Sequence, residues 1–329
     1  MSAKQKIILS GNRPTGKLHL GNYTGALENW VALQKDYKCY FMVADWHVLT
    51  TDIEHTAEIS VNTREMILDW IGAGLDPEIS TLFIQSQVKE HAELFLLLSM
   101  LVTVSRLERN PTVKEQVRDL AMDQNISFGH LGYPVLQASD ILIYRADLVP
   151  VGEDQLPHIE ITREIARKFN MFFGKVFPMP EGQLTRFPRF TGLDGKRMSK
   201  SLGNTIEISD SPEKIKKKIR AAFTDPSRQK RSDPGHPEIC LIYDYWKKFK
   251  PDKQEEIREA CSTAKIGCVE CKQQVADAIA EFFGPLRERR KAIEDRPGAV
   301  EEIIQTGNGQ ARERACDTMR MVREKMKIG

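Results

Sequence analysis

The stretch that decides the fold lies near the N-terminus and reads Ile7-Ile8-Leu9-Ser10-Gly11-Asn12-Arg13-Pro14-Thr15-Gly16-Lys17-Leu18-His19-Leu20-Gly21-Asn22. Residues 7–10 are typical of a buried strand, and a glycine-containing turn then leads into a helix that starts near Asn22. Such a turn directs backbone N–H groups and the positive end of a helix dipole toward an anion. The spacing matches neither G-x-G-x-x-G nor G-x-x-x-x-G-K-[ST], so neither of those nucleotide-binding motifs is predicted.

Two side chains of this stretch are candidates for contact with the anion. His19 and Asn22 are three residues apart and can face the same ligand, while Gly21 permits close backbone approach. The alternative is a tight strand-to-helix turn that binds nothing.

Strand-like and helix-like segments alternate through the first half of the chain. The expected strands are residues 7–10, 39–44, 81–85 and 147–151, and the expected helices between them are 23–34, 56–71, 92–106 and 158–169. Such alternation predicts an α/β fold, a Rossmann-like parallel sheet with helices on both faces, over residues 1–191.

The second half is charged and helical in period. The expected helices are residues 214–223, 238–249, 254–261, 271–291 and 313–327, with a loop at 225–237. We therefore expect an all-helical C-terminal domain over residues 205–329, whose last helix packs back on the first domain. Residues 192–204 are expected to be a mobile loop between the two domains.

Composition restricts the class of protein. The 329 residues include 48 basic and 46 acidic ones, a net charge of +2, which argues against binding nucleic acid by bulk charge. The apolar run 94–104 is too short to span a bilayer, and the N-terminus lacks the layout of a signal peptide. We expect a soluble cytoplasmic protein that makes no membrane contact.

A second candidate phosphate element reads Gly192-Leu193-Asp194-Gly195-Lys196-Arg197-Met198-Ser199-Lys200-Ser201-Leu202-Gly203-Asn204. Its three basic side chains could close over pyrophosphate and neutralise charge that develops on a leaving group. On its own the segment could also be a solvated basic loop.

The two elements together carry a family resemblance. His19-Leu20-Gly21-Asn22 resembles the HIGH signature of class I aminoacyl-tRNA synthetases, and Arg197-Met198-Ser199-Lys200-Ser201 resembles their KMSKS signature, in the same order. Asn22 replaces the final histidine, and Arg197 replaces a lysine with a planar fork of equal charge. The resemblance implies an enzyme that activates an amino acid with ATP and Mg²⁺.

Further segments resemble the tryptophanyl members of that family over nearly the whole chain, namely residues 11–22, 43–47, 133–142 and 149–155. Asp140 matches the family residue that accepts the indole N–H. A carboxylate acceptor in an apolar pocket would reject phenylalanine, which lacks the donor, without an editing domain. Alternatively, Asp140 could cap a turn and His47 could be a core histidine.

The resemblance also implies the other site residues. Lys200, His19 and Asn22 are expected to be catalytic, because they would stabilise charge on the phosphates. Lys114 aligns with a lysine that contacts the triphosphate, although a second lysine of some relatives is here Gln116. The expected ATP-binding residues are Arg13, Thr15, Gly21, Asn22, Lys114, Gly152, Asp154, Arg197, Met198, Ser199, Lys200 and Ser201. The expected tryptophan-binding residues are Leu9, His47, Tyr133, Gln137, Asp140, Val149, Val151 and Gln155.

Four cysteines near the C-terminal end, Cys240, Cys261, Cys268 and Cys271, follow the pattern C-x20-C-x6-C-x2-C. Four thiolates can bind zinc or a cubane cluster, although a zinc ribbon usually has two C-x-x-C pairs and this pattern has one. A subset of bacterial tryptophanyl enzymes resembles this arrangement, which implies a [4Fe–4S] cluster near the anticodon-recognising region. Zn²⁺ and a metal-free set of thiols are the alternatives.

The implied partners are L-tryptophan, ATP and tRNA(Trp), and a homodimer through the apolar region 94–107 is expected. Two other classes of protein are alternatives to this interpretation. One is a related adenylate-forming enzyme, such as a tyrosyl-tRNA synthetase or a pantothenate synthetase. The other is a synthetase-like RNA-binding or iron-sensing protein without aminoacylation.

Overall fold

The computed structural model describes residues 5–119, 126–184 and 190–329. It divides into two compact units. The sheet unit comprises Met1–Gly16, Glu28–Arg186 and Ile293–Gly329, and the helical unit comprises Lys17–Leu27 and Phe187–Ala292. This division differs from simple boundaries at residues 191 and 205, because the segment after the first strand joins the helical unit and the C-terminal segment joins the sheet unit.

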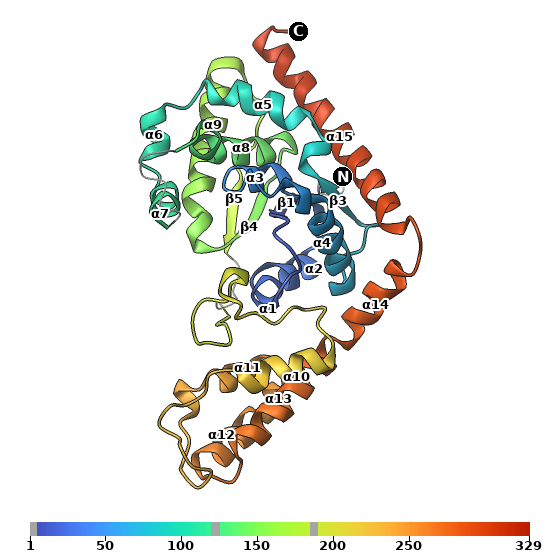
Figure 1. Cartoon of the computed structure of the whole chain (residues 1–329). Coiled ribbons are helices and arrows are strands. Elements are labelled where there is room, and N and C mark those ends of the chain that lie inside the picture. The colour runs from blue at the N-terminus through green and yellow to red at the C-terminus, as the bar shows by residue number, and fades with distance from the viewer. Residues whose placement is uncertain (1–4, 120–125, 185–189) are drawn as a thin grey trace. The chain divides into compact units, whose positions relative to one another are not determined.

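The sheet unit is built on five parallel strands in the order β3-β2-β1-β4-β5 (Figure 1). The strands are β1 Ile7–Asn12, β2 Lys38–Val43, β3 Ser80–Ile84, β4 Leu148–Val151 and β5 Glu181–Leu184. The order reverses between β1 and β4, and a ligand site is expected beyond the carboxyl ends of the strands at such a point. The predicted α/β fold class is confirmed, with β5 as an additional strand.

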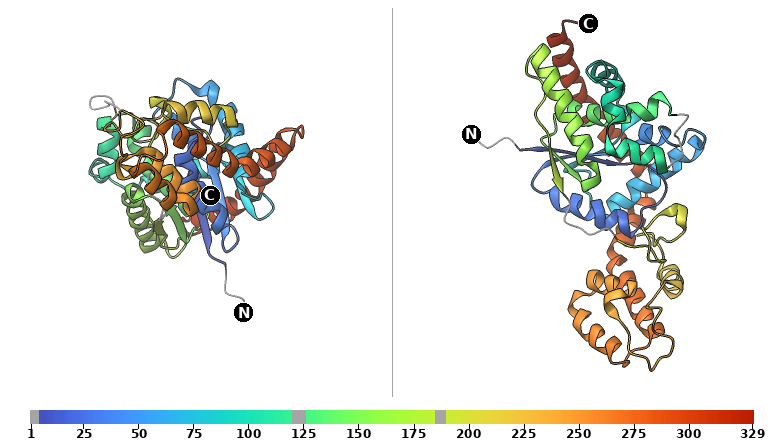
Figure 2. Two further views of the ribbon diagram at one scale, coloured as in Figure 1. Left: turned by 90° about the horizontal axis from the view of Figure 1, so that it is seen from below. Right: turned by 90° about the vertical axis from the view of Figure 1, so that its left-hand side faces the viewer.

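Helices cover the sheet on both faces, as the two views of Figure 2 show. Those of the sheet unit are α2 Glu28–Leu33, α3 Asp45–Leu49, α4 Ile59–Ala73, α5 Glu90–Ser99, α6 Val104–Glu108, α7 Pro111–Asp119, α8 Phe128–Ile143, α9 Leu156–Phe173 and α15 Ala299–Met326. A core cluster joins one face of the sheet to α5, α8, α9 and α15.

The last helix, α15, is longer than the predicted 313–327 and begins at Ala299. Its Ala311, Ala315, Met319 and Val322 are buried in the core of the sheet unit. The polar run before residue 313 concealed the first half of this helix, because small and polar residues there contact a strand rather than an apolar face.

The helical unit contains α1 Leu20–Asn22, α10 Pro212–Ala221, α11 Leu241–Phe249, α12 Gln254–Ser262, α13 Cys268–Phe282 and the start of α14 Gly284–Glu294. The single predicted helix 271–291 is thus two helices. Pro285 has no N–H for an intrahelical bond, and proline is favoured in the first turn, so a new helix begins there. Among the described residues, no helix is long and apolar enough to cross a membrane.

Candidate active site

The acceptor predicted for an indole, Asp140, lies deep in the sheet unit on α8 and is only 1% exposed. Its Oδ2 accepts hydrogen bonds from Nε2 of His47 at 2.8 Å and from Nε2 of Gln85 at 3.0 Å. Its Oδ1 accepts from Nε2 of Gln85 at 2.8 Å and from Nδ1 of His91 at 2.6 Å. Burial alone would raise the pKa of Asp140, but the hydrogen bonds from His47 and His91 lower it to about 2. The carboxylate is therefore ionised at neutral pH.

A second layer orients these donors. The hydroxyl of Tyr144 lies 2.7 Å from Nε2 of His91, and burial together with nearby Asp140 raises the pKa of Tyr144 well above its ordinary value. Tyr144 therefore keeps its proton and donates it to Nε2, which leaves Nδ1–H of His91 to donate to Asp140. Oε1 of Gln85 accepts the backbone N–H of Trp46 at 3.2 Å, which turns the amide nitrogen toward Asp140.

Sequence reasoning missed Gln85, His91 and Tyr144. Each is fully buried. A signal was present, because Gln85 directly follows a buried strand and His91 precedes the apolar run, and a buried polar side chain needs a partner. Their convergence on one carboxylate required the three-dimensional fold.

The same unit contains an apolar wall on two neighbouring strands. Leu9 on β1 and Val149 and Val151 on the neighbouring β4 are buried and belong to the same core cluster as α8. Side chains alternate along a strand, so the two valines, two residues apart, lie on the same face. Their contact with a substrate ring stays a prediction.

Three polar residues predicted for the same ligand also belong to the sheet unit. Tyr133 is buried, which raises its pKa, and its hydroxyl lies 2.9 Å from Nε2 of His158. Gln137 is half-buried on α8, one turn before Asp140. Gln155 donates from Nε2 to Oδ2 of Asp154 at 3.0 Å.

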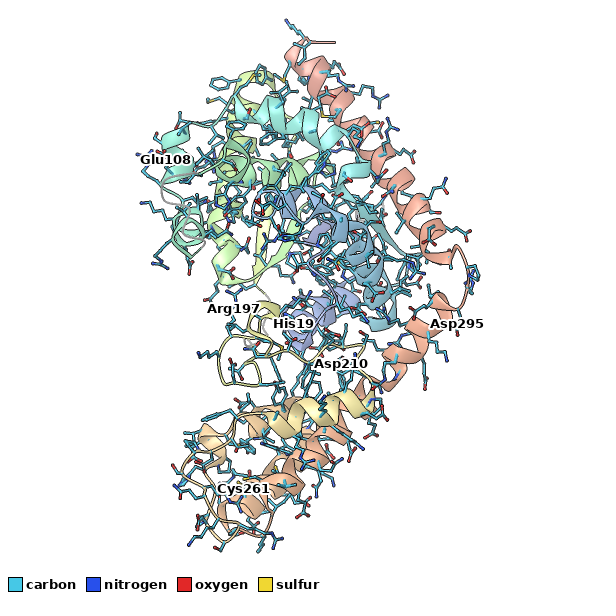
Figure 3. The ribbon with its side chains drawn as sticks, viewed as in Figure 1. His19, Glu108, Arg197, Asp210, Cys261 and Asp295 are labelled. Carbon is cyan, nitrogen blue, oxygen red and sulfur yellow. The ribbon has the colours of Figure 1, made fainter. Side chains whose placement is uncertain are left out.

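His19 and Asn22 lie in the helical unit at the short helix α1. The backbone N–H of His19 donates to Oδ1 of Asn22 at 3.1 Å. Burial, with the positive charges of Lys200 and Arg197 close by, lowers the pKa of His19 to about 4 (Figure 3). The imidazole is therefore neutral at neutral pH, and its buried Nδ1 makes no hydrogen bond within the described residues.

The two signature segments contact each other inside the helical unit. The backbone N–H of Leu20 donates to the carbonyl of Ile206 at 2.9 Å, just after the basic loop. A Cβ added to Gly21 would lie 3.1 Å from the ring of His19 and 3.7 Å from Cβ of Met198. A side chain at position 21 would be tight against the ring of His19 and in ordinary contact with Met198, so glycine favours this close approach.

The loop of residues 192–204 is organised around the buried Asn204. Its Oδ1 accepts the backbone N–H of Ser199 at 2.8 Å, and its Nδ2 donates to Oδ1 of Asp194 at 2.7 Å and to the carbonyl of Arg197 at 3.0 Å. A Cβ on Gly192 would lie 2.3 Å from Nδ2 of Asn204. One side chain thus fixes the backbone on both sides of Arg197.

The remaining residues predicted for ATP divide between the two units. In the sheet unit, Nη1 of Arg13 donates to Oγ1 of Thr51 at 3.0 Å, and the backbone N–H of Thr15 donates to the carbonyl of Arg13 at 2.9 Å. A Cβ at Gly152 would lie 2.7 Å from Oδ1 of Asp154, so a side chain there would displace that carboxylate. Lys114 is exposed on α7. The side chain of Ser201 lies outside the described residues.

The four predicted cysteine ligands converge in the helical unit, at the end marked by Cys261 in Figure 3. Burial raises the pKa of Cys271 to about 12; the hydrogen bond from Trp246 opposes this, and the other three cysteines are near enough to add to it. Yet no three His, Cys, Asp or Glu side chains of the described residues stand in metal-binding geometry.

Burial disfavours the thiolate form of Cys271 and Cys261, but two N–H donors oppose it. Nε1–H of Trp246 points at Sγ of Cys271 at 3.3 Å, and Nη1 of Arg228 lies 3.7 Å from Sγ of Cys261. A Cβ on Gly235 would lie 2.4 Å from Sγ of Cys261, so glycine leaves that sulfur its space. Donors aimed at sulfur are typical of the outer layer of thiolate centres.

A parallel sheet in the order 3-2-1-4-5, together with an HLGN segment joined to an RMSKS loop, defines the class I aminoacyl-tRNA synthetases. Within that class the chain belongs to the family of tRNA synthetases class I (W and Y), whose model matches residues 1–284.

Individual relatives agree with this assignment. The chain is 48% identical to the tryptophan–tRNA ligase of Thermotoga maritima, over 98% of this chain and 99% of the relative. It is 42% identical to that of Aquifex aeolicus, again over 98% and 99%. The crystal structure of Campylobacter jejuni tryptophanyl-tRNA synthetase complexed with ADP and tryptophan superposes with a TM-score of 0.89 at 32% identity, covering 98% of this chain and 100% of that one.

Proposed function

We propose that the protein is a tryptophan–tRNA ligase, which activates L-tryptophan with ATP and transfers it to the 3′ end of tRNA(Trp). The main observation behind this proposal is Asp140, a buried and ionised carboxylate in the same unit as the apolar wall of Leu9, Val149 and Val151. An indole offers one N–H on a large apolar ring system, and the sheet unit supplies both a charged acceptor and an apolar surface that would suit it. The relatives named above are tryptophan enzymes, which supports the same substrate.

His47 holds the position on Asp140 that the substrate would take. Of the donors to the carboxylate, Gln85 and His91 are fully buried, whereas His47 retains 12% side-chain exposure. The indole N–H would replace the Nε2–H of His47 on Oδ2. Phenylalanine has no N–H to donate. Its binding would therefore gain no hydrogen bond to Asp140, which would stay bonded to His47, and this disfavours phenylalanine as a substrate.

Activation of tryptophan is in-line attack of its carboxylate on the α-phosphate of ATP, with pyrophosphate as the leaving group. Mg²⁺ enters with ATP as part of the substrate. Lys200 supplies positive charge to the phosphates, while the neutral His19 supplies a hydrogen-bond donor. Asn22, which binds the backbone of His19, fixes the position of that imidazole.

Transfer is attack of a terminal ribose hydroxyl of the tRNA on the carbonyl of the adenylate. AMP leaves with the bonding electrons of the broken C–O bond. Both steps depend on positioning and charge stabilisation, so the chemistry needs no nucleophilic side chain.

Pyrophosphate exchange into ATP tests this proposal with tryptophan, tyrosine and pantoate as alternative substrates. We expect exchange with tryptophan alone. Asp140→Asn should raise the KM for tryptophan about a hundredfold, since it removes a charged acceptor, and leave the KM for ATP unchanged. Exchange that depends on tyrosine or pantoate instead would refute the substrate, and wild-type exchange in Lys200→Ala would refute the mechanism.

We further propose that Cys240, Cys261, Cys268 and Cys271 hold a [4Fe–4S] cluster, with Zn²⁺ as the alternative occupant. The proposal is supported by four thiols near each other, by the N–H donors of Trp246 and Arg228, and by the space beside Gly235. A bound cluster would cross-link the helices of this end of the helical unit, a structural or anticodon-linked role. Iron, sulfide and zinc analysis of anaerobically purified protein distinguishes the two occupants.

We also propose a homodimer and a cytoplasmic location. Leu96 on α5, Met100 directly after α5 and Val104 on α6 expose 56%, 70% and 57% of their surface, more apolar area than one short segment usually leaves in water. Cytoplasmic thiols stay reduced, in keeping with six unpaired cysteines among the described residues. Sedimentation of the wild type and of Met100→Glu tests the dimer, which the charged variant should weaken.

A further inference from the structure

We propose that the C-terminal helix α15 is a positioning element for amino-acid selection. It contacts the three segments whose side chains orient Asp140 by direct hydrogen bonds or through His91. The inference rests on the proposed function and adds a role for residues more than 150 positions away in sequence from that carboxylate. The positioning residues are Asn308, Arg312 and Arg314.

Asn308 fixes the segment that carries Gln85. Its Oδ1 accepts the backbone N–H of Ile84 at 2.9 Å, one residue before Gln85 donates to both oxygens of Asp140. At the other end of the strand, the hydroxyl of Thr81 donates to Oε1 of Gln310 at 3.0 Å. β3 is the edge of the sheet in the described part of the chain, so Asn308 of α15 accepts a backbone N–H that no neighbouring strand takes there.

The helix lies directly against the strand backbone at Gly307. A Cβ at this position would lie 1.8 Å from the carbonyl oxygen of Leu82, an overlap that no side-chain movement could relieve. The contact is therefore backbone against backbone, and a displacement of α15 moves β3 with it.

Two arginines of the same helix hold the other two segments. Nε of Arg312 donates to Oε1 of Glu90 at 3.1 Å, and Glu90 immediately precedes His91. Nε and Nη2 of Arg314 donate to the carbonyl of Tyr144 at 3.2 and 3.1 Å, and the hydroxyl of Tyr144 binds His91. Gln85, His91 and Tyr144 are thus each anchored by α15, at their own backbone or at the preceding residue.

Core filling alone does not account for these contacts. Ala311, Ala315, Met319 and Val322 already attach the helix to the core through apolar burial. The polar contacts instead end on groups next to the donors of Asp140. Loss of one of these polar contacts should leave α15 packed on the core but make the orientation of the Asp140 carboxylate less well defined.

The experiment compares tryptophan with its isostere in which sulfur replaces the indole N–H. The ratio of their kcat/KM values in pyrophosphate exchange reports how well Asp140 accepts that hydrogen bond. We expect Asn308→Leu to lower this ratio about tenfold, with the KM for ATP unchanged. Asn308→Asp keeps an acceptor for Ile84 and should restore the ratio. Arg314→Met provides a second, independent disruption with the same expected fall.

Arg320→Ala is the matched control, since Arg320 is an exposed residue of α15 whose pairing with Asp317 lies within that helix. A normal ratio in both Asn308→Leu and Arg314→Met, even with a lowered melting temperature, would overturn the inference and leave α15 a purely structural helix. Absence of tryptophan-dependent exchange in the wild type would instead reject the proposed function.

Discussion

The imidazole of His91 and the carboxylate of Asp140 are joined by a 2.6 Å hydrogen bond inside a core from which water is excluded. Because Tyr144 donates to the opposite nitrogen, the proton on Nδ1 of His91 is fixed on the side of Asp140. A buried carboxylate that loses such a donor bears the cost of its desolvation without full compensation.

The first prediction follows from that bond. His91→Phe should raise the KM for tryptophan at least tenfold, because Asp140 loses a donor, its pKa rises and its orientation relaxes. Saturation of pyrophosphate exchange with tryptophan measures the effect, with the KM for ATP as the internal reference. His55→Phe is the control, since His55 is exposed and pairs with Asp52 on the surface, away from Asp140. Equal effects of both substitutions would contradict the role assigned to His91.

The second prediction concerns acid stability. Burial, together with nearby His47, lowers the pKa of His158 to about 4 from its ordinary 6.5, and only Asp154 opposes this shift. As the pH falls, His158 is therefore protonated in the unfolded chain before it is protonated in the folded chain. The stability contributed by neutral His158 is complete above pH 6.5 and declines as the pH falls toward 4. The full loss is on the order of 3 kcal/mol.

Denaturant titrations from about pH 7 to about pH 4 should show this decline in the free energy of unfolding. His158→Gln, which keeps an acceptor for the hydroxyl of Tyr133, should flatten it. The stability contributed by neutral His19 should decline over the same interval, because the pKa of His19 is also lowered to about 4. Part of the pH dependence should therefore persist in His158→Gln. An unchanged slope in His158→Gln would show that this imidazole is not held neutral.

The extent to which the sequence predicts this molecule depends on how local each feature is. β1, β2, β3 and β4 are runs of apolar residues that reveal a strand by themselves, whereas β5 reads Glu-Gly-Gln-Leu and forms only because β4 offers a free edge. Asp140 was predicted from its place in a family motif. Gln85 and His91 were not, because their shared partner lies about fifty residues further along the chain.

The contacts that place the HLGN segment in the helical unit are equally distant in sequence. Residues 17–27 follow β1 directly, yet their contacts are with the second half of the chain. Tyr23 packs edge-to-face on Phe282 and Phe283, with ring centroids 5.9 and 5.1 Å apart. No periodicity in the sequence reveals such a pairing, because the aromatic residues are more than two hundred and fifty positions apart.

The third prediction concerns Asn204 in the basic loop. Asn204→Ala removes the three hydrogen bonds that fix Asp194, Arg197 and Ser199, so Lys200 should lose its defined position relative to His19. We expect kcat for adenylate formation to fall about ten- to hundredfold with the KM for tryptophan unchanged. Gln273→Ala, an exposed substitution in the same unit, is the control. A rise in the KM for tryptophan without a fall in kcat would contradict this role.

The fourth prediction concerns the space around Cys261. In Gly235→Ala the added Cβ would stand 2.4 Å from Sγ of Cys261, closer than two nonbonded atoms approach, and would push the thiol away from the other cysteines. Bound iron or zinc per chain should therefore fall well below the wild-type value. The nearest atoms to this Cβ belong to Cys261 and Arg228 and not to the residues assigned to catalysis, so tryptophan-dependent pyrophosphate exchange should be retained while aminoacylation of tRNA falls. Gly309→Ala is a suitable control, because a Cβ there meets no atom within 4 Å among the described residues. Wild-type metal content in Gly235→Ala would show that Cys261 is not a ligand, and loss of exchange in parallel with metal would show that the centre supports the catalytic fold as a whole.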